Sequence, residues 1–393
     1  MNVEKSLAKH IPTLLSLWRG SKNTSGLNGR ELANVSQALL SLQRGLTGNR
    51  KLAGSGYMDN KDHLGAYLLY YWPVSYMQIS YAINSCTLFL SSNSKSSDST
   101  VTILDIGSGP APASVAICDH LSSITTNQIE VTLVDSSTKA MELAKRIYGD
   151  DNPNVKVRTI KTDLQQGLPP VSTKFDIIVM SHSINELWKD KADKIERRSE
   201  FINHIAKNLK PTGLLLISEP ALLETSRSLI QVRDELIKKG FNILSPCLRS
   251  HQCPALSSGP NHTCHAEIQW NPCEPVASIA RSAKLDRESV KMTFFAFCKA
   301  DSVPIQPDNA SYRVVSDGML NKSGRIRYLL CDGEKRIPLS AKNGDSNARQ
   351  NGFFNLQRYD TVKVQSPEIR GDSQNPALGI SDNTKLEIIP FSR

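Results

Sequence analysis

The chain has 393 residues and a mass of 43.4 kDa, with 39% hydrophobic and 22% charged residues. These values exclude a peptide hormone, a disulfide-rich miniprotein, a collagen-like chain and a broadly disordered protein. The length exceeds one average domain of roughly 100–200 residues, so we expect two or three domains and a substantial buried core.

The net charge of +9 is unevenly distributed along the chain. Residues 1–100 hold 10 basic and 5 acidic side chains, and residues 281–393 hold 18 and 13, whereas the middle is close to neutral. Basic flanks attract phosphate groups at long range, so this pattern indicates a small-ligand domain carried by parts that meet a polyanion. The same counts also fit an ordinary soluble protein with a modest basic excess.

Apolar side chains recur at helical spacing near the N-terminus, and we expect a helical region over residues 1–95. Within it, residues 64–94 carry no charge and are numerous enough to span a bilayer. However, Pro73 interrupts this stretch, and five tyrosines supply hydroxyl groups that need partners. The stretch therefore predicts two buried helices rather than a membrane span.

Five short β-rich runs follow, each separated by enough residues for a helix. They are residues 101–107, 129–135, 155–163, 175–181 and 213–219. Strands that alternate with helix-length spacers predict a mostly parallel sheet, whose ligands bind beyond the carboxyl ends of the strands. We expect this α/β domain to cover residues 96–300, with 291–299 as a late strand. After a Pro-containing linker near 301–310, short strand-like runs predict a small β-rich domain over 310–393.

Two glycines follow the first predicted strand, in the order Asp105-Ile-Gly107-Ser108-Gly109. Glycines at this place let the backbone approach a ligand closely, and the next helix offers free N–H groups. A dinucleotide fingerprint would need a third glycine where Pro112 stands. The Asp-x-Gly-x-Gly form instead resembles the first motif of S-adenosylmethionine-dependent methyltransferases.

Later strand ends also carry polar side chains. Asp135 is placed to accept both ribose hydroxyls, and Asp163 to accept from an adenine amino group. Each carboxylate alone fits the role of a helix cap or a loop anchor as well as it fits a ligand contact. Taken in series, these positions predict a cofactor site made of Asp105, Gly107, Ser108, Gly109, Asp135, Asp163 and Ser181.

The segment after the fourth predicted strand contains few residues that indicate catalysis. It has no Asn-Pro-Pro-Tyr or Asp-Pro-Pro-Tyr motif for an exocyclic amine and no cysteine nucleophile. His182, Asn185 and Glu186 are its polar groups, and a lone histidine beside serines is more often a structural hydrogen-bonder. The sequence therefore assigns no catalytic base and leaves binding without turnover open.

Four of the eight cysteines fall within 27 residues: Cys247, Cys253, Cys264 and Cys273. The same window holds His251, His262 and His265. Clustered cysteines in a chain without an evident secretory signal indicate a metal site before disulfides. There is no Cys-x-x-Cys pair, so spacing alone leaves iron–sulfur, zinc and no metal all open.

Five stretches together resemble a specific family, the methyltransferase-like proteins of the small ribosomal subunit. This family comprises mitochondrial small-subunit assembly factors and their bacterial relatives. The likeness covers roughly residues 57–340 and is carried by residues 104–114, 181–187, 216–247, the Cys-rich run through His265, and 325–336.

The resemblance implies a class I S-adenosylmethionine-dependent methyltransferase core of the Rossmann-like α/β class. It also implies an N-terminal helical region, a Cys-rich metal-binding insertion at 245–275 and a small C-terminal β-rich domain. The ligands of a [4Fe–4S] cluster would be Cys247, Cys253, Cys264 and Cys331. Zinc is the alternative, held with help from Cys273 or the histidines of the window. The chain departs from the family at Ala221, where relatives have glycine, and in an extended loop between the second and third of these cysteines.

The expected function follows from this resemblance. We expect a protein that binds S-adenosylmethionine and acts on the small ribosomal subunit, through rRNA methylation or through subunit assembly. The alternatives are a catalytically inactive assembly factor that binds rRNA and a small-molecule methyltransferase with a zinc site. The expected partners are small-subunit rRNA and ribosomal proteins, without a membrane, and the oligomeric state stays open. Glu4 and the lack of an Arg-rich presequence favour bacterial cytoplasm, with the mitochondrial matrix as the alternative.

Overall fold

The computed structural model describes residues 2–43, 59–93, 100–285, 288–299, 310–372 and 375–391. They form two compact units. Unit 1 comprises Met1–Ser218 and Gln269–Val290, and unit 2 comprises Glu219–Ile268 and Lys291–Arg393. Most of the Ser-rich boundary at 91–100 and of the linker at 301–310 lies outside the described residues. The domain boundaries at 95, 300 and 310 therefore stay predictions.

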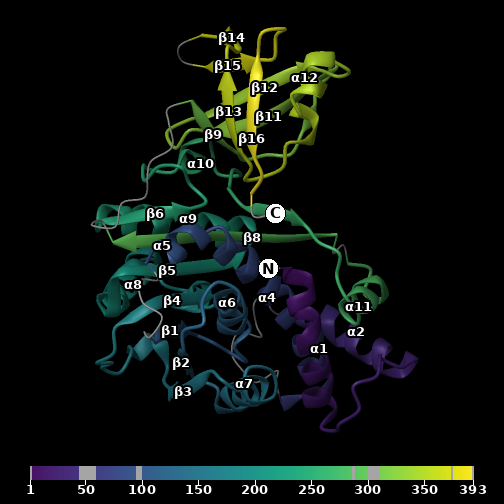
Figure 1. The fold of residues 1–393 in the computed structure, drawn as a ribbon, viewed down its shortest axis with the longest axis vertical. Helices are drawn as coiled ribbons and strands as arrows, with labels where there is room; N and C mark the ends of the chain where they lie inside the picture. Colours follow the sequence, from purple (N-terminus) through teal and green to yellow (C-terminus); the bar gives the residue numbers. More distant parts are fainter. Residues whose placement is uncertain are drawn as a thin grey trace. The chain divides into compact units, whose positions relative to one another are not determined.

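Unit 1 contains a parallel sheet with the strand order β3-β2-β1-β4-β5 (Figure 1). Its strands are β1 Val101–Ile106, β2 Ile129–Asp135, β3 Lys156–Lys161, β4 Phe175–Ser181 and β5 Leu209–Pro220. The connecting helices are α6 Pro112–Ser122, α7 Thr138–Asp151 and α8 Lys194–Ile205, with short 3-10 turns η4 Leu164–Gln166, η5 Ile184–Glu186 and η6 Ala206–Asn208. All five predicted strands are confirmed, and the core is a Rossmann-like α/β fold.

The carboxyl ends of these strands meet at one edge of the sheet. Ile106 of β1 pairs with Val134 of β2 on one side and with Met180 of β4 on the other. Ser181 of β4 pairs in turn with Ser218 of β5. Because parallel strands end at the same edge, the residues that follow them are brought together there.

Helices from the N-terminal part complete unit 1. They are α1 Val3–Arg19, α2 Gly29–Gln43, α3 Lys61–Ala66, the π-helix η3 Tyr67–Tyr71, α4 Trp72–Asn84 and α5 Thr87–Asn93. A further short helix, α11 Val276–Ser282, packs on α2. The predicted buried helices in the charge-free stretch are confirmed, because α4 packs on α6 with Trp72 and Tyr76 fully buried. Within the described part of the chain, no helix has the length and apolar character needed to cross a membrane.

A buried ion cluster joins α1 to the core of unit 1. The His10 side chain is fully buried, with Nε2 2.8 Å from Asp119 Oδ2 and Nδ1 2.6 Å from Asp151 Oδ2. Lys9 Nζ and Tyr76 Oη both donate to Asp119, each at 2.6 Å. Burial lowers the pKa of His10, but the hydrogen bonds to both carboxylates outweigh burial and raise the pKa above 6.5. The cluster therefore favours the imidazolium form.

The first part of unit 2 holds α9 Leu223–Lys238, β6 Phe241–Ser245, α10 Pro254–Ser257, β7 Ala266–Gln269 and β8 Ser289–Lys299. The predicted late strand is confirmed as β8, which pairs antiparallel with β6. Phe241 and Phe297 from these two strands make a T-shaped contact at 6.2 Å. The segment 246–265 has almost no regular structure besides α10, as its high Pro, Cys and His content predicts.

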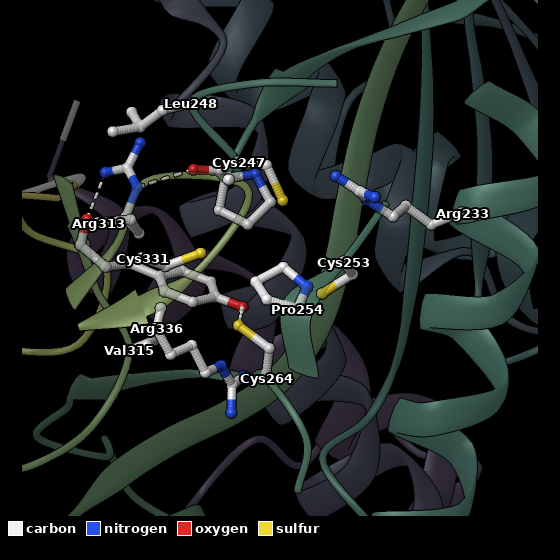
Figure 2. A pocket seen from close by; sticks show the side chains of 13 residues that line it. Arg233, Cys247, Leu248, Cys253, Pro254, Cys264, Arg313, Val315, Cys331 and Arg336 are labelled. Atoms are coloured by element: carbon white, nitrogen blue, oxygen red, sulfur yellow. Dashed lines mark hydrogen bonds between the residues drawn. The ribbon is translucent and has the colours of Figure 1, made fainter. Parts of the chain in front are cut away.

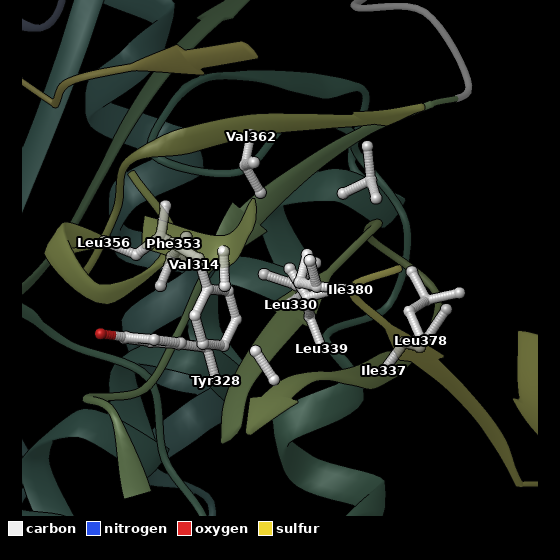
Figure 3. Packing of buried hydrophobic residues seen from close by; sticks show 13 residues of the cluster. Val314, Tyr328, Leu330, Ile337, Leu339, Phe353, Leu356, Val362, Leu378 and Ile380 are labelled. Atoms are coloured by element: carbon white, nitrogen blue, oxygen red, sulfur yellow. The ribbon is translucent and has the colours of Figure 1, made fainter. Parts of the chain in front are cut away.

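The last part of unit 2 is a second sheet, with the strand order β14-β15-β12-β11-β9-β13-β16. Its elements are β9 Ser311–Val314, β10 Met319–Leu320, β11 Arg325–Cys331, β12 Arg336–Lys342, α12 Ser346–Gln350, η7 Phe353–Asn355, β13 Thr361–Gln365, β14 Glu368–Gly371, β15 Pro376–Gly379 and β16 Lys385–Ile389. Figure 3 shows its apolar core, where Leu330, Leu339 and Val362 are fully buried and Tyr328 meets Phe353 edge to face at 5.1 Å. The predicted β-rich character of the C-terminal region is confirmed.

Candidate functional site

The glycine loop after β1 is the first candidate site. Gly107 and Gly109 have positive φ angles of 69° and 52°, which side chains rarely allow. A Cβ atom at Gly107 would lie 2.4 Å from the Cβ of Ser183, so only glycine fits there. The backbone of this loop is therefore held in a tight turn at the strand-end edge of unit 1, where the motif predicts it.

Asp105 lies beneath this loop and is 1% exposed. Its Oδ2 accepts a hydrogen bond from the Ser114 N–H at 3.2 Å, whereas Oδ1 has no partner among the described residues. Burial raises the pKa of Asp105 to about 7. A buried carboxylate oxygen without a donor is costly in the free protein, so it marks a place where a ligand can supply one.

The other two strand-end carboxylates have local backbone partners. Asp135 accepts from the N–H groups of Gly109 and Ser137, both at 2.8 Å. Asp163 caps the η4 turn through the Gln165 N–H at 3.0 Å. These contacts hold the loops in place, and each carboxylate oxygen keeps a second lone pair with which to accept from a ligand.

Two further predicted cofactor residues, Ser108 and Ser181, are at the same edge. Ser108 is 5% exposed, and its N–H donates to Val134 O at 3.0 Å. Ser181 ends β4, and its buried hydroxyl has no partner among the described residues. The structure therefore places all seven predicted cofactor residues on the loops and strand ends of one sheet edge.

Tyr67 is a residue of this site that the sequence analysis does not single out. Its hydroxyl lies 3.3 Å from the position that a Cβ of Gly109 would take. Burial, together with the charges of Asp135 and Asp105, raises the pKa of Tyr67 well above 10, so the phenol stays protonated. Tyr67 begins the π-helix η3, a distortion that often occurs at functional sites.

The segment after β4 holds a constrained histidine rather than an exposed base. His182 has a positive φ of 55°, and its Nε2 lies 2.7 Å from Gln78 Oε1. Burial lowers the pKa of His182 to about 4, so the ring is neutral at physiological pH. Asn185 and Glu186 belong to the η5 turn, where the Asn185 carbonyl accepts from Arg198 at 2.7 Å. The structural role expected for the histidine agrees with its hydrogen bond to Gln78.

A pocket within unit 2 is the second candidate site. Figure 2 shows the sulfur atoms of four cysteines directed toward one common space. They are Cys247, Cys253, Cys264 and Cys331, the four cysteines named by the resemblance. Cys247 follows β6, Cys253 precedes α10, Cys264 precedes β7, and Cys331 ends β11. Residues nearly seventy positions apart in sequence thus line one pocket.

Burial controls the chemistry of these thiols. It raises the pKa of Cys331 to about 12, and it raises the pKa values of Cys247 and Cys253 as well. Without a bound metal, the thiols of Cys247, Cys253 and Cys331 are therefore protonated at neutral pH. The Tyr359 hydroxyl lies 3.4 Å from the Cys264 sulfur.

Arginines surround the thiols. Arg233, Arg313 and Arg336 all line the pocket (Figure 2). The buried Nε atoms of Arg233 and Arg336 have no acceptor among the described residues. Unused buried donors beside four thiols fit an anionic group, such as thiolates or the sulfides of a cluster.

The alternative ligands of the Cys-rich window lie apart from this lining. No histidine lines the pocket, and His251 instead pairs with Glu334 at 3.0 Å. His262, His265 and Cys273 are also absent from the lining. Among the described residues, no three His, Cys, Asp or Glu side chains converge closely enough to hold a single metal ion. Among the residues that line the pocket, the four cysteines are therefore the candidate metal ligands.

Comparison with known proteins decides the family. A profile described as the mitochondrial small ribosomal subunit Rsm22 family matches residues 64–342. The chain belongs to this family. Its matched region includes the glycine loop and all four pocket cysteines. The family is described as mitochondrial, which agrees with the alternative compartment, and the bacterial cytoplasm stays a prediction.

Solved structures with a related fold are distant. A Listeria monocytogenes protein, provisionally named as a class I S-adenosylmethionine-dependent methyltransferase, is 13% identical with a TM-score of 0.39, over 78% of this chain and 88% of that chain. A Pyrococcus furiosus methyltransferase is 15% identical with a TM-score of 0.31, over 54% and 80%. The glycopeptide N-methyltransferase MtfA, complexed with sinefungin, is 15% identical with a TM-score of 0.32, over 57% and 85%. We base no argument on these low scores. No curated protein matches the chain.

Proposed function

We propose that the protein binds S-adenosylmethionine at the glycine loop and acts on the small ribosomal subunit, with a four-cysteine iron–sulfur cluster in unit 2. The family match carries the link to the small subunit. The net charge of +9 supports rRNA as the partner, because basic surfaces bind phosphate backbones.

The residues of the strand-end edge fit the cofactor. When bound, S-adenosylmethionine supplies an activated methyl group on a sulfonium cation. Asp105 and Asp135 provide negative charge at the loop, and the positive φ angles of the two glycines keep the backbone close to the ligand. The unpartnered Oδ1 of Asp105 is the observation that most favours a ligand here.

The same edge favours positioning over proton transfer. His182 is the histidine of the segment 181–187 that follows β4. Because burial lowers its pKa to about 4 and its ring is hydrogen-bonded to Gln78, it is a poor general base at neutral pH. This observation favours a cofactor-binding assembly factor. Methylation of rRNA is the second candidate, supported by the tight glycine loop and by the negative charge beside it.

The four cysteines fit a [4Fe–4S] cluster better than a mononuclear zinc site. The cluster needs four thiolates around an enclosed space, and the pocket lining supplies four cysteines and no histidine. Zinc would need four ligands converging on a single point, at about 2.3 Å from each sulfur. The unused donors of Arg233 and Arg336 would offset the negative charge of four thiolates.

One experiment tests turnover. Anaerobically purified protein is incubated with tritiated S-adenosylmethionine and small subunits from cells that lack the protein, and label in the rRNA is counted. Cofactor binding and rRNA binding without label would support the assembly factor. Label that disappears in Asp105→Asn would instead establish methylation.

A second experiment tests the cofactor site through pH. Because Asp105 has a pKa of about 7, it is increasingly ionised above that value, and an ionised carboxylate favours a sulfonium cation. We expect affinity for S-adenosylmethionine, measured by calorimetry, to rise between pH 6 and pH 8. Affinity for the uncharged S-adenosylhomocysteine should change less. Asp105→Asn should remove the difference, and an unchanged pH dependence in that variant would contradict the assignment.

A further inference from the structure

Each cysteine of the pocket has an arginine hydrogen-bonded to a backbone carbonyl one or two residues away. Arg313 Nε donates to Pro246 O, next to Cys247, at 2.7 Å. Arg336 donates to Thr263 O, next to Cys264, at 2.7 Å.

The remaining two cysteines follow the same pattern. Arg233 donates to the carbonyl of His251, two residues before Cys253. Arg249 donates to the carbonyl of Asp332, which directly follows Cys331.

These contacts connect segments that lie far apart in sequence. Arg313 and Arg336 come from the β-rich sheet and bind the Cys-rich segment. Arg249 comes from the Cys-rich segment and binds the sheet in return. The Cys-rich segment and the β-rich sheet, which together supply the four thiols, are therefore joined by hydrogen bonds that each of them donates to the other.

The strand register directs two of the arginines to the side of the sheet that carries the thiol. Cys331 of β11 is paired with Arg313 of β9 on one side and with Arg336 of β12 on the other. Directly opposed residues of antiparallel strands point to the same face of a sheet. The three side chains thus form one row across the sheet, and all three line the pocket (Figure 2).

Two smaller features support the remaining arginines. Gly333 has a φ of 101°, and a Cβ atom there would lie 2.9 Å from the Cβ of Arg249, so the close approach of Arg249 requires glycine. Arg233 also bonds to Asp234, whose Oδ1 and Oδ2 both lie 3.2 Å from the Cys253 N–H.

We infer that Arg233, Arg249, Arg313 and Arg336 are positioning residues that hold the four cysteines in place for a bound metal cluster. This inference rests on the proposed cluster. The guanidinium groups fix the backbone beside each thiol. Their positive charge also favours the more reduced, more negative state of the cluster.

The test uses the full chain, purified anaerobically, with each of the four arginines changed to glutamine. Release of iron to the chelator bathophenanthroline and the reduction potential of the cluster are measured. We expect release roughly 10-fold faster, because partners that orient metal ligands typically contribute 10–100-fold to metal affinity. The potential should shift to more negative values.

Arg325→Gln is the matched control. Arg325 lies on β11, the same strand as Cys331, and also donates to a carbonyl, that of Ser340 at 3.2 Å, but Ser340 is not next to a pocket cysteine in the sequence. We expect this variant to release iron at the wild-type rate. Equal acceleration in the control and the four variants would overturn the inference, because it would reflect general loss of stability.

Two further variants separate position from charge. Arg313→Lys keeps the charge but loses the planar donor group, so we expect the potential to recover and the fast release to persist. Gly333→Ala keeps every arginine but displaces Arg249, and it should also accelerate release. If Arg313→Lys restored both the wild-type reduction potential and the wild-type rate of iron release, charge alone would explain the effect of the arginine, and the positioning role would be overturned.

Failure of the proposed cluster is distinguishable from failure of this inference. Wild-type protein that contains neither iron nor zinc would overturn both. Protein with zinc and no sulfide would overturn the iron–sulfur proposal, and zinc release from the same variants would then test the arginines. Wild-type protein with iron and sulfide whose release is unchanged in all four glutamine variants would overturn the inference alone.

Discussion

The glycine loop of unit 1 and the cysteine pocket of unit 2 are built in opposite ways. The loop is held by near neighbours along one sheet edge, such as Asp135 with Gly109 and Ser137. The pocket is held by long-range contacts, with Arg313 bound to Pro246 O and Arg249 bound to Asp332 O. A local motif, residues 105–109, can therefore mark the first site in the sequence, whereas the second exists only once distant segments have met.

The largest expected effect comes from Cys331→Ser. Loss of one of four cysteines should abolish the bound cluster, and the energy of metal binding, which also contributes to folding, would be lost from unit 2. Iron and sulfide analysis and thermal unfolding would measure both losses. Affinity for S-adenosylmethionine in unit 1 should stay at the wild-type value. A parallel loss of cofactor binding would show that the two sites are not independent.

His10→Ala tests whether the N-terminal helix supports the first site. Removing the imidazolium leaves Asp119 and Asp151 buried without their main partner, and we expect a loss of about 3 kcal/mol in the free energy of unfolding.

The pH dependence of that loss has a defined sign. Because the pKa of His10 is raised above 6.5, its contribution is fully present below pH 6.5 and is lost as pH rises through the folded pKa. Asp119, whose pKa is lowered to about 2, loses its contribution only as pH falls toward that value. Denaturant unfolding at pH 6 and pH 9 would measure the change. Equal destabilisation by His10→Ala at both pH values would contradict this reading.

Gly107→Ala tests the geometry of the loop. The positive φ and the clash with Ser183 predict a destabilisation of about 1–3 kcal/mol and weaker cofactor binding. Gly149→Ala is the matched control, because Gly149 lies in α7 with open space around its Cβ position. Iron content should stay unchanged in both variants. Equal cofactor affinity in both would show that the loop does not contact the ligand.

Tyr67→Phe carries the smallest expected effect. Loss of one neutral hydrogen-bonding hydroxyl beside Gly109 should lower affinity for S-adenosylmethionine by roughly 3–10-fold. Calorimetry would measure this change, with thermal unfolding as the control for stability. An unaltered affinity would place the tyrosine outside the cofactor site.

The five strands of unit 1 could be predicted because each is a short apolar run bounded by turn residues. The residues of β4 agree with the prediction, while β5 begins at Leu209, four residues earlier than expected. The π-helix at Tyr67 could not be predicted, since it depends on packing rather than on local preference. β6 was also missed, because its five residues follow α9 after a single turn.

The cysteine pocket was predictable only in part. The Cys-rich window is visible in the sequence, but its spacing leaves three neighbouring histidines open as ligands of a zinc alternative, and the structure leaves them out of the lining. No motif in the sequence marks Arg233, Arg249, Arg313 or Arg336 as part of the site. Their role depends on the pairing of Cys331 with Arg313 and Arg336, and strand register between distant segments cannot be read from composition or spacing.

The separation of Cys331 from the other three cysteines has a consequence for synthesis. Translation proceeds from the N-terminus, and domains generally fold in that order. Cys247, Cys253 and Cys264 leave the ribosome well before Cys331, and Tyr359, which contacts Cys264, follows later still. A nascent chain therefore presents three thiols without the rest of the pocket lining until the β-rich sheet of unit 2 has been made. A filled pocket would then report that this sheet has been synthesised and has folded.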